Sequence, residues 1–291
     1  MKAVGYQQSL PIDNPTSLQD ITLADPIASG RDLLVEVKAI SVNPVDTKVR
    51  MRMAPPAGAW KVLGWDAAGV VKAVGSEVVL FKPGDRVWYA GDLTRQGTNA
   101  ELHLVDERIV GRMPDTLDFS QAAALPLTAI TAWEMLFDRL ALRPGKQVTD
   151  DTLLIIGAAG GVGSIMTQLA RRLTGLTIIG TASRPETRTW VRERGAHHVI
   201  DHTKPLTEEL GRIGFPQVSH IVSLTQTDQH FQQIVAAHAR LAGHAGGDDA
   251  DVRALDDRVV GGAAARDVDV ELEDGAGLLQ VEGLALRHPL H

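Results

Sequence analysis

The stretch Thr152-Leu-Leu-Ile-Ile-Gly-Ala-Ala-Gly-Gly-Val-Gly163 decides the fold class of this chain. The apolar run that opens it is typical of a buried parallel strand. A glycine-rich turn follows, and then a segment in which apolar residues recur at helical spacing. Glycines let the backbone turn tightly and approach a pyrophosphate, and the N–H groups and dipole at the helix start then bind the anion. We therefore predict a dinucleotide-binding strand–turn–helix unit.

The glycine turn fits the dinucleotide fingerprint G-x-G-x-x-G imperfectly, because Ala158 stands at its first position. The alternative is a glycine-rich turn in some other α/β protein. The strand before the turn, the helix after it and a second strand at about the expected distance favour the dinucleotide interpretation. The predicted cofactor-binding residues of this turn are Gly157, Ala158, Gly160, Gly161, Val162 and Gly163.

The second strand, predicted over residues 176–182, indicates which dinucleotide is bound. Units that bind NAD place Asp or Glu at the end of this strand, where the carboxylate accepts hydrogen bonds from the ribose hydroxyls. Here Ser183 and Arg184 follow the strand, and the first carboxylate is Glu186. A hydroxyl and a guanidinium suit a 2′-phosphate, so we predict NADP(H) bound by Ser183 and Arg184. The alternative for Arg184 is a solvated residue at a helix start.

Composition excludes several kinds of site. The 291 residues include no cysteine, which excludes disulfides, thiolate nucleophiles and cysteine-ligated zinc sites. No 18-residue apolar run spans a membrane and the N-terminus does not resemble a signal peptide, so we expect a cytoplasmic protein. The formal net charge of −7 gives no reason to expect nucleic-acid or membrane partners.

Residues 240–291 differ in composition from the rest of the chain. They contain 5 Arg and no Lys against 11 acidic residues, and they lack Ile, Phe, Tyr, Trp, Met, Ser and Thr. A segment so poor in large apolar side chains cannot fill a core. We predict that it is a disordered or frameshifted tail, and the alternative is a genuine acidic linker.

Secondary-structure patterns divide the preceding residues into a β-rich part and an alternating part. The first part contains predicted strands at 33–40 and 69–75 and a turn leading into a strand at 81–88, and a helix is predicted over 128–140. The second part alternates strands with helices, which implies a parallel, doubly wound sheet. Its predicted elements are 152–156, 161–174, 176–182, 185–194, 198–200, 219–224 and 227–238.

Several ordered motifs together resemble the medium-chain dehydrogenase/reductase superfamily, specifically its zinc-free quinone-oxidoreductase (ζ-crystallin-like) branch, whose members are often called zinc-type alcohol dehydrogenase-like. The motifs are Ser41-Val-Asn-Pro-Val-Asp-Thr-Lys48, Leu63-Gly-Trp-Asp-Ala-Ala-Gly-Val70, Phe81-Lys-Pro-Gly-Asp-Arg-Val87, Ala122-Ala-Ala-Leu-Pro-Leu-Thr-Ala129, the glycine turn and Gly195-Ala-His-His-Val-Ile-Asp201.

The resemblance implies an α/β protein with a GroES-like β-domain over residues 1–126 and a Rossmann domain over 127–239. Such proteins form homodimers and end in a C-terminal return that completes both domains. Residues 240–291 do not match that return, so the sheet is expected to be C-terminally incomplete and pairing of subunits is not assured.

The resemblance also bears on metal binding. Zinc-dependent relatives hold zinc with a Cys after the second strand and a His in a Gly-His-Glu segment. Here the first place reads Ser41-Val42-Asn43 and the second reads Gly64-Trp65-Asp66. These residues do not supply a set of zinc ligands, and the adjacent His197 and His198 point to opposite faces of a strand. We therefore predict no metal.

Four further site residues follow from the resemblance. Asn43 matches an Asn beside the nicotinamide, and either Thr128 or Thr131 matches a Thr that contacts the cofactor. Lys48 stands where relatives often have Tyr, and it is a candidate proton donor or a solvated lysine. For Asn43 the alternative is a turn residue before a proline.

Trp65, in the place of the zinc-site His, is expected to form an apolar wall of the substrate pocket. His202 ends the third strand of the alternating part, where relatives have a Tyr near the adenosine phosphate; the alternative is a surface histidine. Asp46 and Asp66 are expected to hold loops.

Without a metal to polarise a carbonyl, a substrate needs its own electron sink. A quinone or an α,β-unsaturated carbonyl accepts hydride with only hydrogen-bond help. The leading hypothesis is therefore an NADPH-dependent, zinc-free reductase of such small molecules. The alternatives are a non-catalytic NADP(H)-binding protein and a zinc-type alcohol dehydrogenase.

Overall fold

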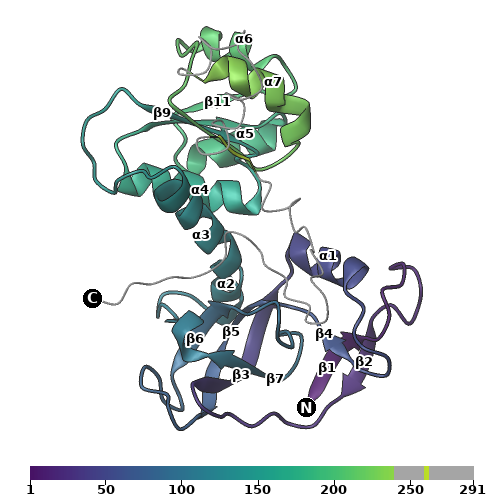
Figure 1. Cartoon of the computed structure of the whole chain (residues 1–291). Helices are drawn as coiled ribbons and strands as arrows, with labels where there is room; N and C mark the ends of the chain where they lie inside the picture. The colour runs from purple at the N-terminus through teal and green to yellow at the C-terminus, as the bar shows by residue number, and fades with distance from the viewer. Residues whose placement is uncertain (239–258, 262–291) are drawn as a thin grey trace, which may run out of the picture. The chain divides into compact units, whose positions relative to one another are not determined.

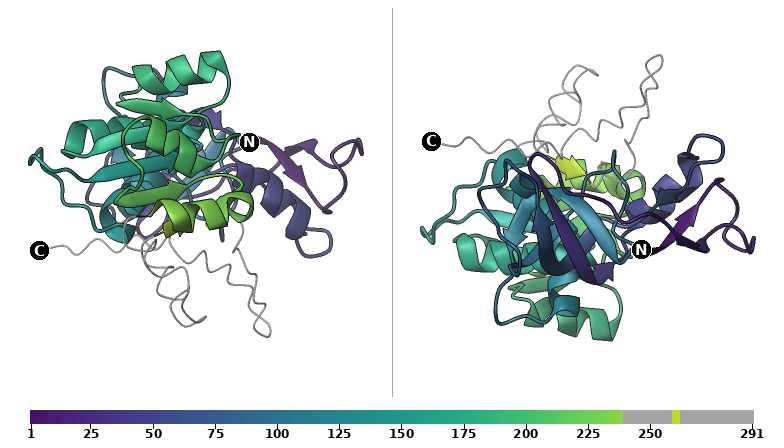
Figure 2. Two further views of the ribbon diagram at one scale, coloured as in Figure 1. Left: turned by 90° about the horizontal axis from the view of Figure 1, so that it is seen from above. Right: turned by 90° about the horizontal axis from the view of Figure 1, so that it is seen from below.

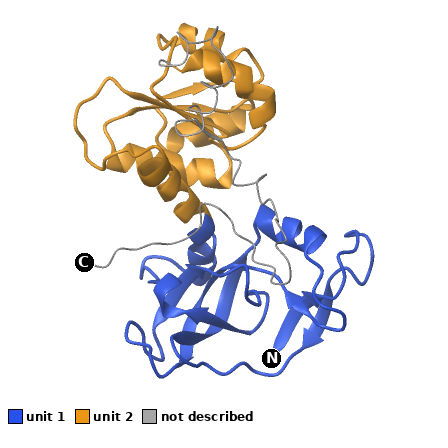
Figure 3. Cartoon of the chain, in the orientation of Figure 1, with its two compact units in different colours: residues 1–127, 270–291 blue, residues 128–269 orange. Residues whose placement is uncertain are grey.

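The structure, a computed structural model, describes residues 1–238 and 259–261 of the chain. The described residues form two compact units, residues 1–127 in unit 1 and residues 128–238 and 259–261 in unit 2 (Figure 3). The predicted disordered or frameshifted tail, 240–291, lies outside the described residues apart from Val259–Gly261. Within the described part of the chain, no helix has the length and apolar character needed to cross a bilayer.

Unit 1 is built from two antiparallel sheets (Figure 1). The larger has the strand order β7-β3-β5-β6-β8 and the smaller has the order β2-β1-β4. Its strands are β1 (Lys2–Tyr6), β2 (Gln19–Thr22), β3 (Asp32–Ser41), β4 (Lys61–Val62), β5 (Asp66–Val74), β6 (Arg86–Ala90), β7 (Leu102–Asp106) and β8 (Val110–Arg112). Unit 1 also contains three short helical segments, of which α1 (Pro44–Arg52) and η1 (Glu107–Ile109) join strands and α2 (Phe119–Ala123) follows β8.

The central strand of the larger sheet, β5, positions Asp66. The predicted strand at 69–75 is part of β5, but β5 begins earlier, at Asp66. Its first residues are fully buried between β3 and β6, and the side chains of Ala67 and Ala68 point to opposite faces of the sheet, into two different core clusters. Asp66 therefore enters the interior of unit 1 at the start of a buried strand.

Unit 2 has one parallel sheet with the order β11-β10-β9-β12-β13, which confirms the predicted doubly wound architecture. The strands are β9 (Thr152–Ile156), β10 (Thr177–Thr181), β11 (His198–Ile200), β12 (His220–Ser223) and β13 (Val259–Gly261). The helices are α4 (Gly161–Leu173), α5 (Pro185–Glu193), α6 (Leu206–Arg212) and α7 (Thr227–Ala237), preceded by α3 (Pro126–Trp133) and the π-helical segment η2 (Glu134–Arg139).

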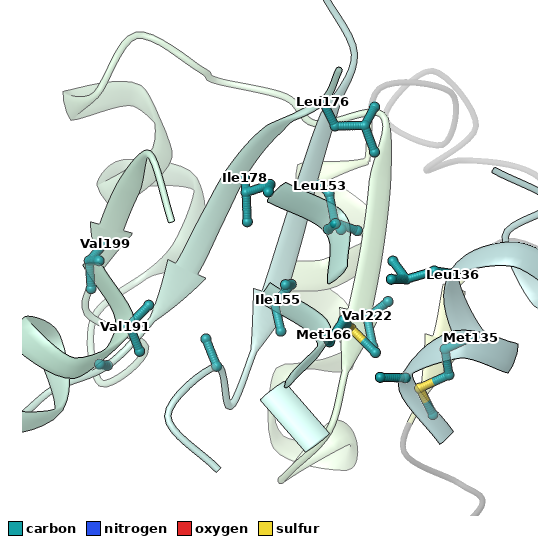
Figure 4. Close-up of a cluster of buried hydrophobic side chains, with 14 residues drawn as sticks. Met135, Leu136, Leu153, Ile155, Met166, Leu176, Ile178, Val191, Val199 and Val222 are labelled. Carbon is teal, nitrogen blue, oxygen red and sulfur yellow. The ribbon is translucent and has the colours of Figure 1, made fainter. Parts of the chain in front are cut away.

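The faces of this sheet are covered by helices (Figure 2). Leu153 and Ile155 of β9 face one cluster, which includes Met166 of α4 and Leu136 of η2 (Figure 4). The alternate residues of β9, Leu154 and Ile156, face a second cluster with α6 and α7. Because successive strand side chains point to opposite faces, a strand covered on both sides must be apolar throughout, as β9 is.

Three features differ from the sequence interpretation. Helix α6 was not predicted, since in seven residues only Leu206 and Leu210 carry the apolar pattern that packs it on the sheet. The predicted helix 128–140 is α3 followed by a π-helical segment. Val259–Gly261 pair with β12 as a fifth parallel strand, whereas the predicted sheet ended at the 219–224 strand.

Candidate active site

The loop after β9 is shaped by glycine. Gly157 has a φ of +85°, which L side chains rarely adopt, and its N–H donates to Thr181 Oγ1 at 3.0 Å. The N–H of Gly160 then donates back to the Gly157 carbonyl at 3.1 Å, which closes the turn. The left-handed residue is thus Gly157, one position before the fingerprint glycine that Ala158 replaces. Ala158 is fully buried and packs in the core of unit 2.

The same loop packs closely on the helix that follows. A Cβ at Gly163 would lie 2.4 Å from the Gly157 carbonyl oxygen and 2.6 Å from the Ala158 Cα, distances that no side chain tolerates. Gly163 is therefore required for the helix to start against the loop, which is the third-glycine role in a dinucleotide fingerprint.

Helix α4 begins with free backbone donors. Gly160 is its N-cap, and the first intrahelical bond runs from the Ser164 N–H to the Gly160 carbonyl. The N–H groups of Gly161, Val162 and Gly163 therefore have no acceptor within the helix. A methyl carbon of Thr128 lies 3.3 Å from where a Gly161 Cβ would stand. The structure thus brings the predicted cofactor residue Thr128 to an electropositive helix start, while Thr131 lies one turn further along α3.

The end of β10 lies beside this loop, because β9 and β10 are adjacent and parallel. Ser183 is half-buried, and Arg184 is the exposed N-cap residue of α5. The guanidinium of Arg188, one turn along α5, donates to the carbonyls of Ala182 and Val199 at 3.3 and 3.2 Å. Sequence reasoning missed Arg188, although its spacing of four from Arg184 on a helix could have signalled a second cation at this strand end.

His202 follows β11 and faces another histidine. Its ring lies 6.2 Å from that of His230 on α7, at 87°. His202 Nδ1 and both ring nitrogens of His230 are buried without a hydrogen-bond partner. Burial, with a smaller contribution from His202, lowers the pKa of His230. Sequence reasoning did not single out His230, because only the fold brings the two rings together.

His197, which precedes β11, and His198, its first residue, have separate environments. His197 accepts the Ile178 N–H at Nδ1 and contacts Arg171 Nη1 through Nε2, at 2.8 and 2.6 Å. The His198 ring packs against Phe215 instead. Among the residues that the structure describes, no group of three or more His, Cys, Asp or Glu could hold a metal ion.

In unit 1, Asn43 and Asp46 together start α1. The Asn43 N–H donates to Asp46 Oδ2 at 2.7 Å, and the Asp46 N–H donates back to the Asn43 carbonyl at 3.0 Å, so the two residues bond reciprocally at the helix start. Burial raises the pKa of Asp46, although backbone hydrogen bonds from Asn43 and Gly64 oppose that shift. Lys48 lies half-buried on the same helix.

Asp66 holds this cap from the neighbouring strand. Asn43 Nδ2 donates to Asp66 Oδ2 at 2.8 Å, and the Leu127 N–H at the start of α3 donates to Asp66 Oδ1 at 2.8 Å. The Asp66 side chain is fully buried, and this burial raises its pKa to about 6 against the opposing effect of the two hydrogen bonds. The expectation that Asp46 and Asp66 hold loops agrees with these contacts.

Trp65 lies next to Asp66 in the interior of unit 1. Only 2% of it is exposed, and it packs with Tyr6, Val49 and Leu63. Its Nε1 is buried without a hydrogen-bond partner. The ring is thus part of a core cluster, and its predicted role as a pocket wall stays a prediction.

Comparison with known proteins places these features in a family. Residues 29–115 match the alcohol dehydrogenase GroES-like domain. A zinc-type alcohol dehydrogenase-like protein of Staphylococcus aureus is 41% identical over 237 residues, which cover 81% of this chain and 70% of the relative. The chain belongs to the medium-chain dehydrogenase/reductase superfamily.

The names of other similar proteins refer to different substrates, metals and cofactors. A quinone oxidoreductase of Pseudomonas aeruginosa is 42% identical over 174 residues, 60% of this chain and 51% of the relative. One solved structure, from Rhizobium etli CFN 42, is named as a zinc-dependent alcohol dehydrogenase. It is 58% identical to this chain with a TM-score of 0.78, and the match covers 82% of this chain and 70% of that one. A mycobacterial protein solved with NADPH is 27% identical, with a TM-score of 0.67 and coverages of 82% and 71%.

Some of these names refer to zinc, so we asked whether the residues of this chain at the corresponding positions could bind a zinc ion. Trp65 offers no ligand atom, and both oxygens of Asp66 accept hydrogen bonds from Asn43 and Leu127. Protein zinc sites use three or four Cys, His or carboxylate ligands, and Asp66 is the one such side chain among residues 41–43 and 64–66. The residues at the two zinc-ligand positions therefore do not fit a zinc ion.

Proposed function

We propose that this oxidoreductase-superfamily protein transfers hydride from NADPH to a quinone or an α,β-unsaturated carbonyl without zinc. The observation that carries the proposal is the hydrogen bond from Asn43 to Asp66, which joins an amide and a carboxylate from the two sequence segments where the resemblance implies zinc ligands in zinc-dependent relatives. The names of the quinone oxidoreductase relatives support the substrate class.

Residues of unit 2 fit the pyrophosphate of a nicotinamide dinucleotide. The Gly157 turn leaves backbone rather than side chains at the loop surface, and the free N–H groups at the start of α4 can hold the anion. When bound, the reduced nicotinamide supplies the hydride. We assign Thr128 and Thr131 to the cofactor, and His202 to its adenosine end.

The choice of NADPH over NADH rests on the end of β10. Ser183 and Arg184 would bind the 2′-phosphate, and Arg188 adds a second guanidinium within one helical turn. Arginine grips phosphate oxygens in a bidentate manner, and the segment lacks the carboxylate that would accept hydrogen bonds from an unphosphorylated ribose.

On the substrate side, Asn43 would donate a hydrogen bond to the acceptor oxygen, and Lys48 is a candidate proton donor. A conjugated acceptor gains negative charge on its oxygen as hydride arrives, so a fixed donor at that oxygen lowers the barrier. Trp65 would exclude water from the same side.

Quinone-dependent oxidation of NADPH tests this proposal. The protein is mixed with 1,4-benzoquinone and either NADPH or NADH, before and after treatment with EDTA. We expect turnover that prefers NADPH and survives the chelator. Tight NADPH binding without turnover of quinone or enone would instead favour the non-catalytic binding protein, and loss of turnover with EDTA would favour a zinc enzyme.

A further inference from the structure

The hydrogen bonds of the Asn43 side chain can be counted. An amide side chain has one acceptor oxygen and two N–H donors. The Asp46 N–H donates to the Asn43 backbone carbonyl at 3.0 Å, and one Nδ2 hydrogen of Asn43 goes to Asp66 Oδ2 at 2.8 Å. One Nδ2 hydrogen is left for a ligand.

The Asp66 carboxylate is itself fixed in place. It is fully buried, and the Leu127 N–H holds its second oxygen at 2.8 Å. Leu127 is the second residue of α3, where backbone N–H groups have no intrahelical acceptor and a negative charge is favoured. The carboxylate therefore bridges the start of α3 and the cap of α1, and it cannot turn away from Asn43 without leaving a buried donor unsatisfied.

We propose that Asp66 is a positioning residue that sets the orientation of the Asn43 amide, so that Asn43 presents an N–H and not its carbonyl oxygen to the substrate oxygen. An ionised carboxylate only accepts hydrogen bonds, so it selects the orientation with Nδ2 toward itself. A protonated Asp66 can donate instead, which removes this selection and with it the fixed donor. The inference rests on the proposed function for the identity of the substrate, but not for the orientation itself.

The ionisation of Asp66 falls within an accessible pH range. Burial raises its pKa to about 6, and the titratable group that faces it is Asp46 of α1, whose negative charge acts in the same direction. Its cross-strand neighbours are Ser41 on β3 and Ala90 on β6, neither of which titrates near this pH. The selecting form of Asp66 is therefore complete above about pH 7 and decreases as the pH falls through 6.

Kinetics of Asp66→Asn, Asn43→Ala and the double variant test the proposal. We expect Asp66→Asn to lower kcat for quinone about tenfold with an unchanged KM for NADPH, and to remove the acid limb near pH 6. Because Asp66 acts through Asn43, adding Asn43→Ala should cost little more. Additive losses, or an unchanged acid limb, would overturn the proposal. Asp118→Asn, which removes an exposed capping carboxylate of α2 in the same unit, controls for general loss of stability.

A second measurement is independent of turnover and of the variants' folding. In ¹⁵N-labelled wild-type protein the Asn43 side-chain amide signal should shift with a midpoint near pH 6, as Asp66 titrates. A flat Asn43 signal between pH 5 and 8 contradicts the proposal. A titrating signal in a protein that does not reduce quinones would support the positioning role while rejecting the proposed substrate class.

Discussion

The dinucleotide loop of unit 2 and the Asn43 cluster of unit 1 are built in different ways. The loop depends on backbone conformation, since Gly157 has a positive φ and Gly163 leaves no room for a Cβ. The cluster depends on side chains that are far apart in sequence, since Asp66 joins Asn43 at a separation of 23 residues and Leu127 at a separation of 61. The loop should therefore be sensitive to steric change and the cluster to charge and pH.

The largest effect is expected from Gly163→Ala. The new methyl would lie 2.4 Å from the Gly157 oxygen, so loop or helix must shift. We expect NADPH affinity to fall by about a hundredfold or more, because the backbone donors lose their common geometry. Calorimetric titration with NADPH measures this.

The matched control for that variant is Gly211→Ala on α6. A Cβ there meets nothing within 4 Å, so the methyl should leave NADPH affinity unchanged and raise helix stability by up to about 1 kcal/mol. Equal affinity losses in the two variants would mean that the loop geometry does not determine binding.

The next effect concerns acid stability of unit 1. His103 Nε2 donates to the Gln96 carbonyl at 3.0 Å, so its Nδ1 accepts the Tyr89 hydroxyl at 3.0 Å and the ring is neutral. Burial lowers its pKa to about 4 from an ordinary 6.5. Its stabilising contribution is therefore complete above about pH 6.5 and is lost as the pH falls toward 4. Asp66 acts with the opposite sign, because its raised pKa favours the folded state as the pH falls through 6.

Denaturant unfolding at pH 7 and at pH 5, monitored by hydrogen exchange of individual amides, measures the stability of each unit separately. The His103 effect alone is about 2 kcal/mol at pH 5, and it should appear in amides of β6 and β7 and disappear in His103→Gln. If His103→Gln loses as much protection in these strands between pH 7 and pH 5 as the wild type does, His103 does not govern their acid stability.

A smaller effect is expected at the end of β10. Arg184→Ala should reduce the preference for NADPH over NADH by about tenfold, or about 1.4 kcal/mol, and leave NADH binding nearly unchanged. Arg192→Ala, which removes an exposed arginine from the last turn of the same helix, is the control. Equal losses for both cofactors in Arg184→Ala would identify Arg184 as structural.

The contrast between the dinucleotide loop and the Asn43 cluster also explains which features could be predicted from the sequence. The strand at 152–156 and the alternation after it follow from local patterns and glycine chemistry, and β9 has those bounds. Helix α6 is too short to show a period. The bonds of Asp66 and the approach of His202 to His230 depend on chain segments that only the fold brings together. Sequence patterns carry local constraints well and long-range side-chain contacts poorly.

Hydride transfer from deuterated NADPH to a small enone, in protein whose zinc content is known, tests the central claim most directly. Mass spectrometry locates the deuterium in the product, and elemental analysis of the same sample counts the metal. We predict deuterium on the β-carbon of the reduced enone, well below one zinc per chain, and the same rate after chelation. One zinc per chain, with transfer abolished by the chelator, would contradict it.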